Sequence, residues 1–318
     1  MSLIYVGIDE AGYGPMLGPL CVAAAVFAVD CWTEGQPSPD LWELLGRAVC
    51  KSASDSRRRV PVADSKQLKL PNAARRDPLL HLERGVLAFH HAWLGPIESD
   101  EALFDRLGVR LDDEPWYAGP SRPLPRAGTV EQLRIDANML LREANAAGVR
   151  LVALRCLTLG ESAFNAVIRQ HGNKAATTTH ALRSLVRRVL QDWPDRDIRI
   201  VCDRQGGRMR YADALGGLCA SSPEPLEESP RASRYALGER VRVLLIPRAE
   251  QAHLPVALAS MTAKLVRELA MTRFNQYWGE RLPGLKGTAG YTQDARRWLD
   301  DAGAVLDAAT REILVRLA

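Results

Sequence analysis

Two adjacent acidic residues, Asp9 and Glu10, stand at the end of an apolar run near the start of the chain, and glycines at 12 and 14 follow them. Burying an unpaired carboxylate costs several kcal/mol, so acids at the end of a core strand predict a cation, a hydrogen-bond donor or a metal beside them. Side chains alternate faces along a strand, so the two acids converge only if the chain turns there, as glycine permits. The alternative is a strand end in solvent, and this pair alone does not decide between them.

Two further acids lie far away in the sequence. Asp203 ends a second apolar run and is again followed by glycines. Glu268 lies in a helix-like run, with Lys264 one turn earlier on the same face. The alternative for Glu268 is an ordinary surface salt bridge to Lys264, and taken alone this residue favours that alternative.

Apolar runs and helical periodicity predict the elements that position these acids. Short, β-branched or alternating runs predict five strands, and longer runs of helical period fill the intervals. The strands are expected at residues 4–9, 20–29, 149–157, 198–202 and 241–246, and the helices at 131–147, 174–190, 255–278 and after residue 291. This order predicts an α/β protein with a central five-stranded mixed sheet flanked by helices.

Two stretches interrupt the pattern, and we expect the whole chain, 1–318, to form a single domain around them. Residues 72–129 are rich in Pro and Trp yet contain enough apolar sequence for a helical insertion. Residues 206–240 carry SSPEPLEESPRASR, a composition typical of a mobile loop insertion. Residues 279–318 predict a C-terminal helical segment.

The composition sets only wide bounds on function. The formal net charge is +4 and the sequence pI is about 8.8, a mild basic excess that suits a nucleic-acid partner. The six cysteines are far apart, without the close spacing of a zinc site or a redox motif, which indicates a reducing cytoplasm. No run approaches the length of a membrane span, so we expect a cytoplasmic protein with no membrane partner and no obligate protein partner.

Six segments, read in order, resemble the signatures of type 2 ribonuclease H (ribonuclease HII), a family of the ribonuclease H-like superfamily. GIDEAGYGP at 7–15 resembles that family's GIDEAGRGP, and ALASMTAKLVRE at 257–268 resembles its AAASIIAKVTRD. The weaker matches are ADSKQL at 63–68, Asn173 with Ala181 and Leu182, VCD at 201–203, and GYTQDARRWL at 290–299. The resemblance implies a ribonuclease H-like fold.

The resemblance also implies an activity: two-metal hydrolysis that cleaves the RNA strand of RNA/DNA hybrids or ribonucleotides within DNA. Four converging carboxylates would repel one another unless cations neutralise them, and hard oxygen ligands favour Mg²⁺ or Mn²⁺. The implied catalytic and metal-binding residues are Asp9, Glu10, Asp203 and Glu268. The implied substrate-binding residues are Gly12, Tyr13, Gly14, Ser65, Lys66 and Lys264, although Lys66 is equally well read as a solvated surface lysine. His253 precedes the Glu268 helix, where a histidine is more often a helix-start residue than a proton shuttle.

Three departures from the family pattern bear on the substrate. Tyr13 replaces the arginine of the family's GRG segment, Glu268 replaces an aspartate, and no tyrosine follows Tyr291. A non-catalytic nucleic-acid-binding homologue and a nuclease of the same fold that acts on DNA therefore stay open. A sugar-kinase or actin type of phosphotransferase is disfavoured, because PMLGPLCV offers no Ser or Thr to bind phosphate.

Overall fold

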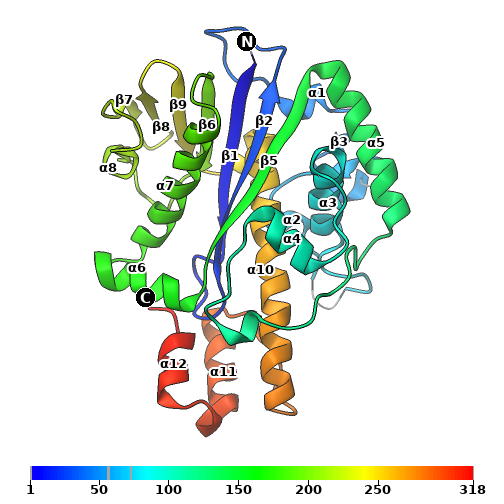
Figure 1. Cartoon of the computed structure of the whole chain (residues 1–318), viewed down its shortest axis with the longest axis vertical. Coiled ribbons are helices and arrows are strands. Elements are labelled where there is room, and N and C mark those ends of the chain that lie inside the picture. The colour runs from blue at the N-terminus through cyan, green and yellow to red at the C-terminus, as the bar shows by residue number, and fades with distance from the viewer. Residues whose placement is uncertain (1, 56–57, 72–73, 318) are drawn as a thin grey trace.

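The computed structural model describes residues 2–55, 58–71 and 74–317, which build a mixed sheet with helices on both faces (Figure 1). The seven strands of the main sheet follow the order β5-β2-β1-β6-β9-β8-β7. They are β1 (Leu3–Ala11), β2 (Leu20–Val29), β5 (Val149–Leu159), β6 (Ile198–Asp203), β7 (Glu224–Glu228), β8 (Ser233–Leu237) and β9 (Val241–Ile246). A separate pair joins β3 (Val49–Cys50) to β4 (Val60–Pro61). The five strands expected from the sequence are β1, β2, β5, β6 and β9, which confirms the α/β class.

Helices account for most of the remaining chain. They are α1 (Leu41–Leu44), α2 (Ser65–Leu68), α3 (Leu80–Leu94), α4 (Asp100–Leu107), α5 (Val130–Ala147), α6 (Glu161–His171), α7 (Ala175–Asp192), α8 (Ala212–Leu215), α9 (Ala249–Ala252), α10 (Leu254–Arg281), α11 (Thr292–Ala302) and α12 (Ala308–Leu314). Short 3₁₀ turns cover Ala53–Asp55, Pro115–Tyr117 and Gly303–Val305. None of the helices in the described residues is both long enough and apolar enough to cross a membrane.

The central strands carry apolar side chains on both faces because both faces are covered. Ile4, Val6 and Ile8 of β1 belong to a core shared with α6 and α7, whereas Leu3 and Tyr5 belong to a second core shared with α3, α5 and α10. Helix α10 packs directly on β1 and β2. A Cβ atom at Gly7 would lie 2.1 Å from the backbone of Pro255, so the helix approaches the strand as closely as glycine allows.

The sheet is longer than expected, because residues 206–240 are not a mobile loop throughout. They contain α8, β7 and β8, and β8 pairs antiparallel with β9 through residues 233–237. Tyr235 is fully buried, and its hydroxyl accepts a hydrogen bond from the Tyr211 amide. The Ser, Pro and Glu composition of the preceding stretch concealed a hairpin, whose apolar side chains complete the core beneath α7.

Residues 72–129, of which 72 and 73 lie outside the described residues, contain α3, α4 and a 3₁₀ turn. A buried ion pair fixes this region to α10: Arg273 donates to Asp100 over distances of 2.8 and 2.9 Å. After α10 the chain forms α11 and α12, and residue 318 lies outside the described residues. Whether the 72–129 region is an insertion, and whether the chain is one domain, stay predictions.

Candidate active site

Asp9 and Asp203 lie at the carboxyl ends of neighbouring parallel strands. In the pairing of β1 with β6, Ile8 lies opposite Cys202, so the next residue on each strand is an aspartate. Tyr5 of β1 and Val201 of β6 belong to the core on the α10 side, and side chains two or four residues apart share a face. Both aspartates therefore lie on the α10 side of the sheet.

The pKa values of Asp9 and Glu10 are raised first by burial and then by the charges of neighbouring acids. Burial raises the pKa of Asp9 well above its usual range, the Glu10 charge raises it further, the Ser260 side chain opposes the rise, and Asp203 adds to it. Burial and the Asp203 charge raise the pKa of Glu10 to about 7, against the influence of Lys66. Three of the four acids predicted from the sequence, Asp9, Glu10 and Asp203, are thus brought together, and their negative charges are mutually unfavourable.

Backbone groups of the segment that follows β9 form hydrogen bonds with the Asp203 side chain. Burial raises its pKa, while hydrogen bonds from the backbone at Ala249, Arg204 and Arg248 lower it. The Ala249 amide donates to Asp203 Oδ1 over 3.2 Å. The turn before this amide places Arg248 at φ 58°, in the left-handed region that a non-glycine residue rarely adopts.

Glu250 is an acid of this site that the sequence reasoning missed. It is 9% exposed, burial raises its pKa, and the charges of Asp203 and Asp64 raise the pKa further, whereas Lys66 lowers it. The signal was present in the sequence, because Glu250 follows the end of the predicted strand 241–246. That strand, β9, is the parallel neighbour of β6, so the acids after both strands reach the same edge of the sheet.

Glu268 is not brought to the other acids, which corrects the prediction made for it. Its Oε1 lies 2.7 Å from Lys264 Nζ and its Oε2 lies 3.6 Å from Lys69 Nζ. Eight residues of α10 separate Glu268 from Ser260, which neighbours Asp9, and eight residues of helix span about 12 Å. The salt bridge that the sequence left as the alternative is the arrangement in the structure. Lys264 is occupied by that salt bridge and does not lie free beside the acids.

The DSK segment lies beside the acids. The Asp64 side chain caps α2 by accepting from the Lys66 amide over 2.9 Å. Ser65 is buried, and its hydroxyl lies 3.0 Å from that of Ser260, so it joins α2 to α10. Lys66 is exposed and its charge lowers the pKa of three acids, Glu10, Asp203 and Glu250. Lys66 therefore supplies positive charge beside these acids.

Two buried arginines donate hydrogen bonds to the backbone of the turn after β1. Arg316 donates from Nη1 to the carbonyl oxygens of Gly12 and Gly18 and from Nη2 to that of Tyr13. Arg267 is fully buried, and its Nη2 donates to the Leu17 carbonyl over 3.2 Å. Gly12 has φ 92°, and a Cβ atom there would lie 2.6 Å from Arg267 Nε.

The outer side of the same turn is open. Tyr13 is 37% exposed, and Lys174 Nζ lies 5.4 Å from the centroid of its ring. A Cβ atom at Gly14 would meet nothing within 4 Å. Of the three turn residues expected to contact substrate, Tyr13 and Gly14 are accessible, whereas Gly12 packs against Arg267.

His253 lies at the start of α10, as expected. Its Nδ1 lies 2.5 Å from the Tyr5 hydroxyl. Burial lowers the pKa of His253 and raises that of Tyr5. The contact ties the first turn of the helix to β1, which is a structural role.

The acids do not form a closed metal site as they stand. Among the residues that the structure describes, no group of three or more His, Cys, Asp or Glu side chains is arranged to hold a metal ion. The donor set is nevertheless made of carboxylate oxygens, which Mg²⁺ and Mn²⁺ prefer, and after burial the charges of neighbouring acids raise the pKa values of Asp9 and Glu10. The chemistry of these residues fits a divalent cation.

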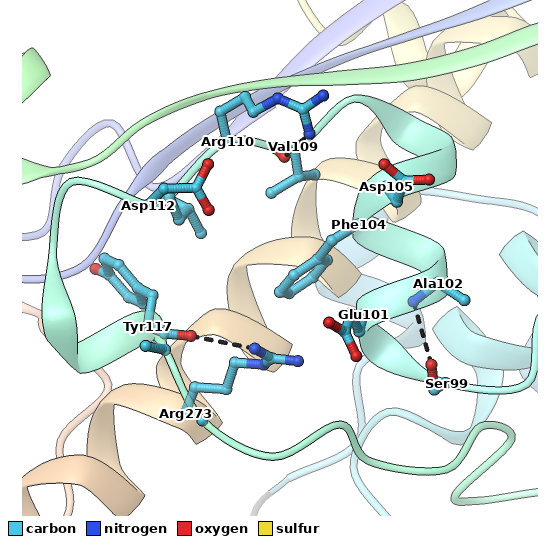
Figure 2. A pocket seen from close by; sticks show the side chains of 13 residues that line it. Ser99, Glu101, Ala102, Phe104, Asp105, Val109, Arg110, Asp112, Tyr117 and Arg273 are labelled. Carbon is cyan, nitrogen blue, oxygen red and sulfur yellow. Dashed lines mark hydrogen bonds between the residues drawn. The ribbon is translucent and has the colours of Figure 1, made fainter.

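A cavity elsewhere in the fold does not contain these acids. It has a volume of 770 Å³ and is built by α4, the following loop and α10 (Figure 2). Arg273, one of the two arginines that line it, donates to Asp100 and to the Tyr117 carbonyl.

No protein-family model and no curated protein matches the chain, whereas several solved structures do. Ribonuclease HII of Archaeoglobus fulgidus, solved in complex with PCNA, is 17% identical, with a TM-score of 0.45 and coverage of 99% of this chain and 94% of that chain. Ribonuclease H2 of Pyrococcus horikoshii OT3 is 15% identical, with a TM-score of 0.47 and coverage of 98% and 96%. Bst ribonuclease HIII, solved with Mn²⁺, is 19% identical, with a TM-score of 0.40 and coverage of 98% and 69%.

Proposed function

We propose that this protein is a metal-dependent endonuclease that cleaves the RNA strand of RNA/DNA hybrids or ribonucleotides within DNA. The observation that supports the proposal is the meeting of Asp9, Glu10 and Asp203 at the ends of two parallel strands, where the charge of Asp203 raises the pKa values of both Asp9 and Glu10. Buried carboxylates that repel one another destabilise the folded state, and such clusters are typical of sites that bind a functional cation.

In this proposal Asp9, Glu10, Asp203 and Glu250 hold Mg²⁺ or Mn²⁺. A bound divalent ion would activate water and stabilise the leaving oxygen of a phosphodiester. We infer that Glu250, and not Glu268, is the fourth metal-binding acid. The charge of Asp203 acts on Glu250, whereas Glu268 forms a salt bridge with a lysine.

The remaining residues of the site bind and orient the nucleic acid. Lys66 is exposed beside the carboxylates and would contact a backbone phosphate. Gly14 offers open space at the turn, and the Tyr13 ring presents a flat apolar surface to the sugar of the nucleotide being cut. The Tyr13 side chain does not carry the positive charge of the family's arginine, so recognition of the 2′-hydroxyl would rest on backbone groups of the turn.

The test is cleavage of an end-labelled RNA/DNA hybrid and of a duplex with one embedded ribonucleotide, with Mg²⁺, with Mn²⁺ and with chelator. We expect cutting only with metal, and a loss of at least about a hundredfold in the Asp9→Asn variant. Cutting without metal, or cutting unchanged by Asp9→Asn, contradicts the proposal. Hybrid binding without turnover would assign the protein to the non-catalytic class, and cleavage of all-DNA duplex would assign it to DNA nucleases.

A further inference from the structure

The half of the sheet formed by β6, β9 and β8 has one covered face and one open face. Val241, Val243 and Leu245 of β9 are buried beneath α7 and α8, whereas Arg242, Leu244 and Ile246 on the opposite face are only half-buried. Helix α10 covers that opposite face at β1 and β2. The open face lies at the end of the sheet that is occupied by β6 to β9 in Figure 1.

A groove of 400 Å³ lies on this open face, and its floor is aliphatic. The floor is formed by Val201, Leu244 and Ile246, with Leu226 of β7 at one side. Leu226 is 52% exposed, although it is a large apolar side chain. The volume falls in the range of about 300 to 1,000 Å³ that is usual for ligand-binding clefts.

Two arginines stand side by side in the groove without an acidic partner. Arg199 of β6 and Arg242 of β9 are directly paired in the sheet register. Burial lowers the pKa of Arg199, the charge of Asp197 opposes this, and the charge of Arg242 lowers the pKa further. Like charges at paired positions of a sheet are destabilising, so this arrangement has a cost for the fold. Among the described residues, neither arginine has a carboxylate within 4 Å, and the acids Asp197 and Glu34 influence Arg199 from farther away.

The hydrogen bonds of these arginines leave most of their donors available. Arg199 donates from Nη1 to the carbonyls of Ile198 and Arg240, and Arg242 donates from Nη1 to those of Gly238 and Val241. Each guanidinium has five N–H groups and prefers a carboxylate or phosphate that accepts two at once. A third arginine of the groove, Arg234, is already paired with Glu227 at 2.9 Å.

We propose that this groove is a docking site for a short acidic segment of a partner protein, with a large apolar side chain placed between carboxylates. The apolar side chain would fill the aliphatic floor, and the carboxylates would pair with Arg199 and Arg242. A nucleic acid fits the groove less well, because bases bind single-strand sites by stacking on exposed aromatic rings. Tyr235 of the groove is fully buried, and His253 contacts Tyr5.

The experiment probes labelled protein with an array of short peptides of about a dozen residues. Each peptide has one Leu, Ile or Phe flanked by Asp or Glu, and matched peptides carry Lys in place of the acids or Ser in place of the apolar residue. We expect binding only where acids and the apolar residue are combined. The dissociation constant of the best peptide should rise at least about tenfold in Arg199→Gln and in Arg242→Gln, and also in Leu244→Ser.

The control variant is Arg142→Gln on α5, whose side chain is 77% exposed and which should bind peptides as the parent protein does. Circular dichroism and thermal unfolding of each variant establish that the comparison is between folded proteins. The proposal is overturned if no acidic peptide binds better than its Lys counterpart, or if the arginine variants bind unchanged. It is also overturned if the same variants lose binding of a single-stranded oligodeoxynucleotide instead, which would make the face part of a nucleic-acid site.

Discussion

Arg316 Nη1 lies 2.6 Å from the carbonyl oxygen of Gly12, although the two residues are 304 positions apart in the sequence. The same guanidinium donates to Gly18 and Tyr13, so one side chain joins both ends of the turn after β1. Burial, and then the charge of Arg267, lower the pKa of Arg316 to about 10. Through Arg316, the C-terminal segment therefore stabilises the turn in which Tyr13 and Gly14 lie next to the candidate active site.

Replacing Arg316 by lysine should destabilise the protein, because an ammonium group cannot reach the three carbonyls that the planar guanidinium spans. Hydrogen bonds that involve a charged group contribute about 1.5 to 3 kcal/mol each, so we expect the free energy of unfolding to fall by about 2 kcal/mol or more. Urea denaturation measures the change. Arg311→Lys on α12, at an exposed position, is the matched control. Equal stability of the two variants would show that Arg316 does not hold the turn.

The strands β1, β2, β5, β6 and β9 were predictable from the sequence because each is a compact apolar run. Acids at the ends of β1 and β6 indicated the edge of the sheet where the candidate active site lies. The prediction for Glu268 was wrong because helical periodicity shows which face of a helix a residue occupies, but not how far along the helix axis the other acids lie. Glu250 was missed because it belongs to the four-residue helix α9, which is too short to give a periodic signal. The hairpin of β7 and β8 was hidden by polar composition, since β7 has no buried residue and β8 begins with Ser233 and Arg234.

The assignment of Glu250 in place of Glu268 can be tested by two conservative variants. Glu250→Gln should lower Mn²⁺ affinity and metal-dependent cleavage at least about tenfold, because it removes a charge next to Asp203. Glu268→Gln should leave both nearly unchanged and cost about 1 kcal/mol of stability, since Lys264 and Lys69 lose their shared carboxylate.

Calorimetric titration with Mn²⁺ and single-turnover cleavage of a labelled hybrid separate metal binding from chemistry for these two variants. Loss of metal binding in Glu268→Gln with a fully active Glu250→Gln would reverse the assignment. Loss in both would mean that α10 moves toward the acids when the ion binds.

Glu161 should make stability depend on pH. Burial, and then the Glu114 charge, raise the pKa of Glu161 from 4.5 to about 7 in the folded protein. The folded state therefore binds this proton more tightly than the unfolded state, so the contribution to stability is complete below pH 4.5 and is lost as the pH rises through 7.

Glu161→Gln keeps an oxygen to accept the Gly18 amide, which lies 2.8 Å from Glu161 Oε1, but it does not ionise. Relative to the parent protein, this variant should gain up to about 3 kcal/mol of stability between pH 4.5 and 7. Urea denaturation at a series of pH values measures the gain. Glu312→Gln, at a 74% exposed side chain, should show no such trend, and parallel curves for the two variants would contradict the buried-acid account.

Gly7 and Gly14 lie in the same sequence motif but should respond oppositely to alanine. A Cβ atom at Gly7 would lie 2.1 Å from backbone atoms of Pro255 and Val256, so α10 would have to move away from β1. Overpacking of this kind costs about 1 to 3 kcal/mol or more, and the displaced helix would also take Ser260 away from Asp9. Gly14→Ala meets nothing within 4 Å and should change stability by less than about 0.5 kcal/mol. Thermal unfolding of the two variants gives the comparison, and a Gly7→Ala protein as stable as Gly14→Ala would show that α10 does not pack on β1 at the distance described.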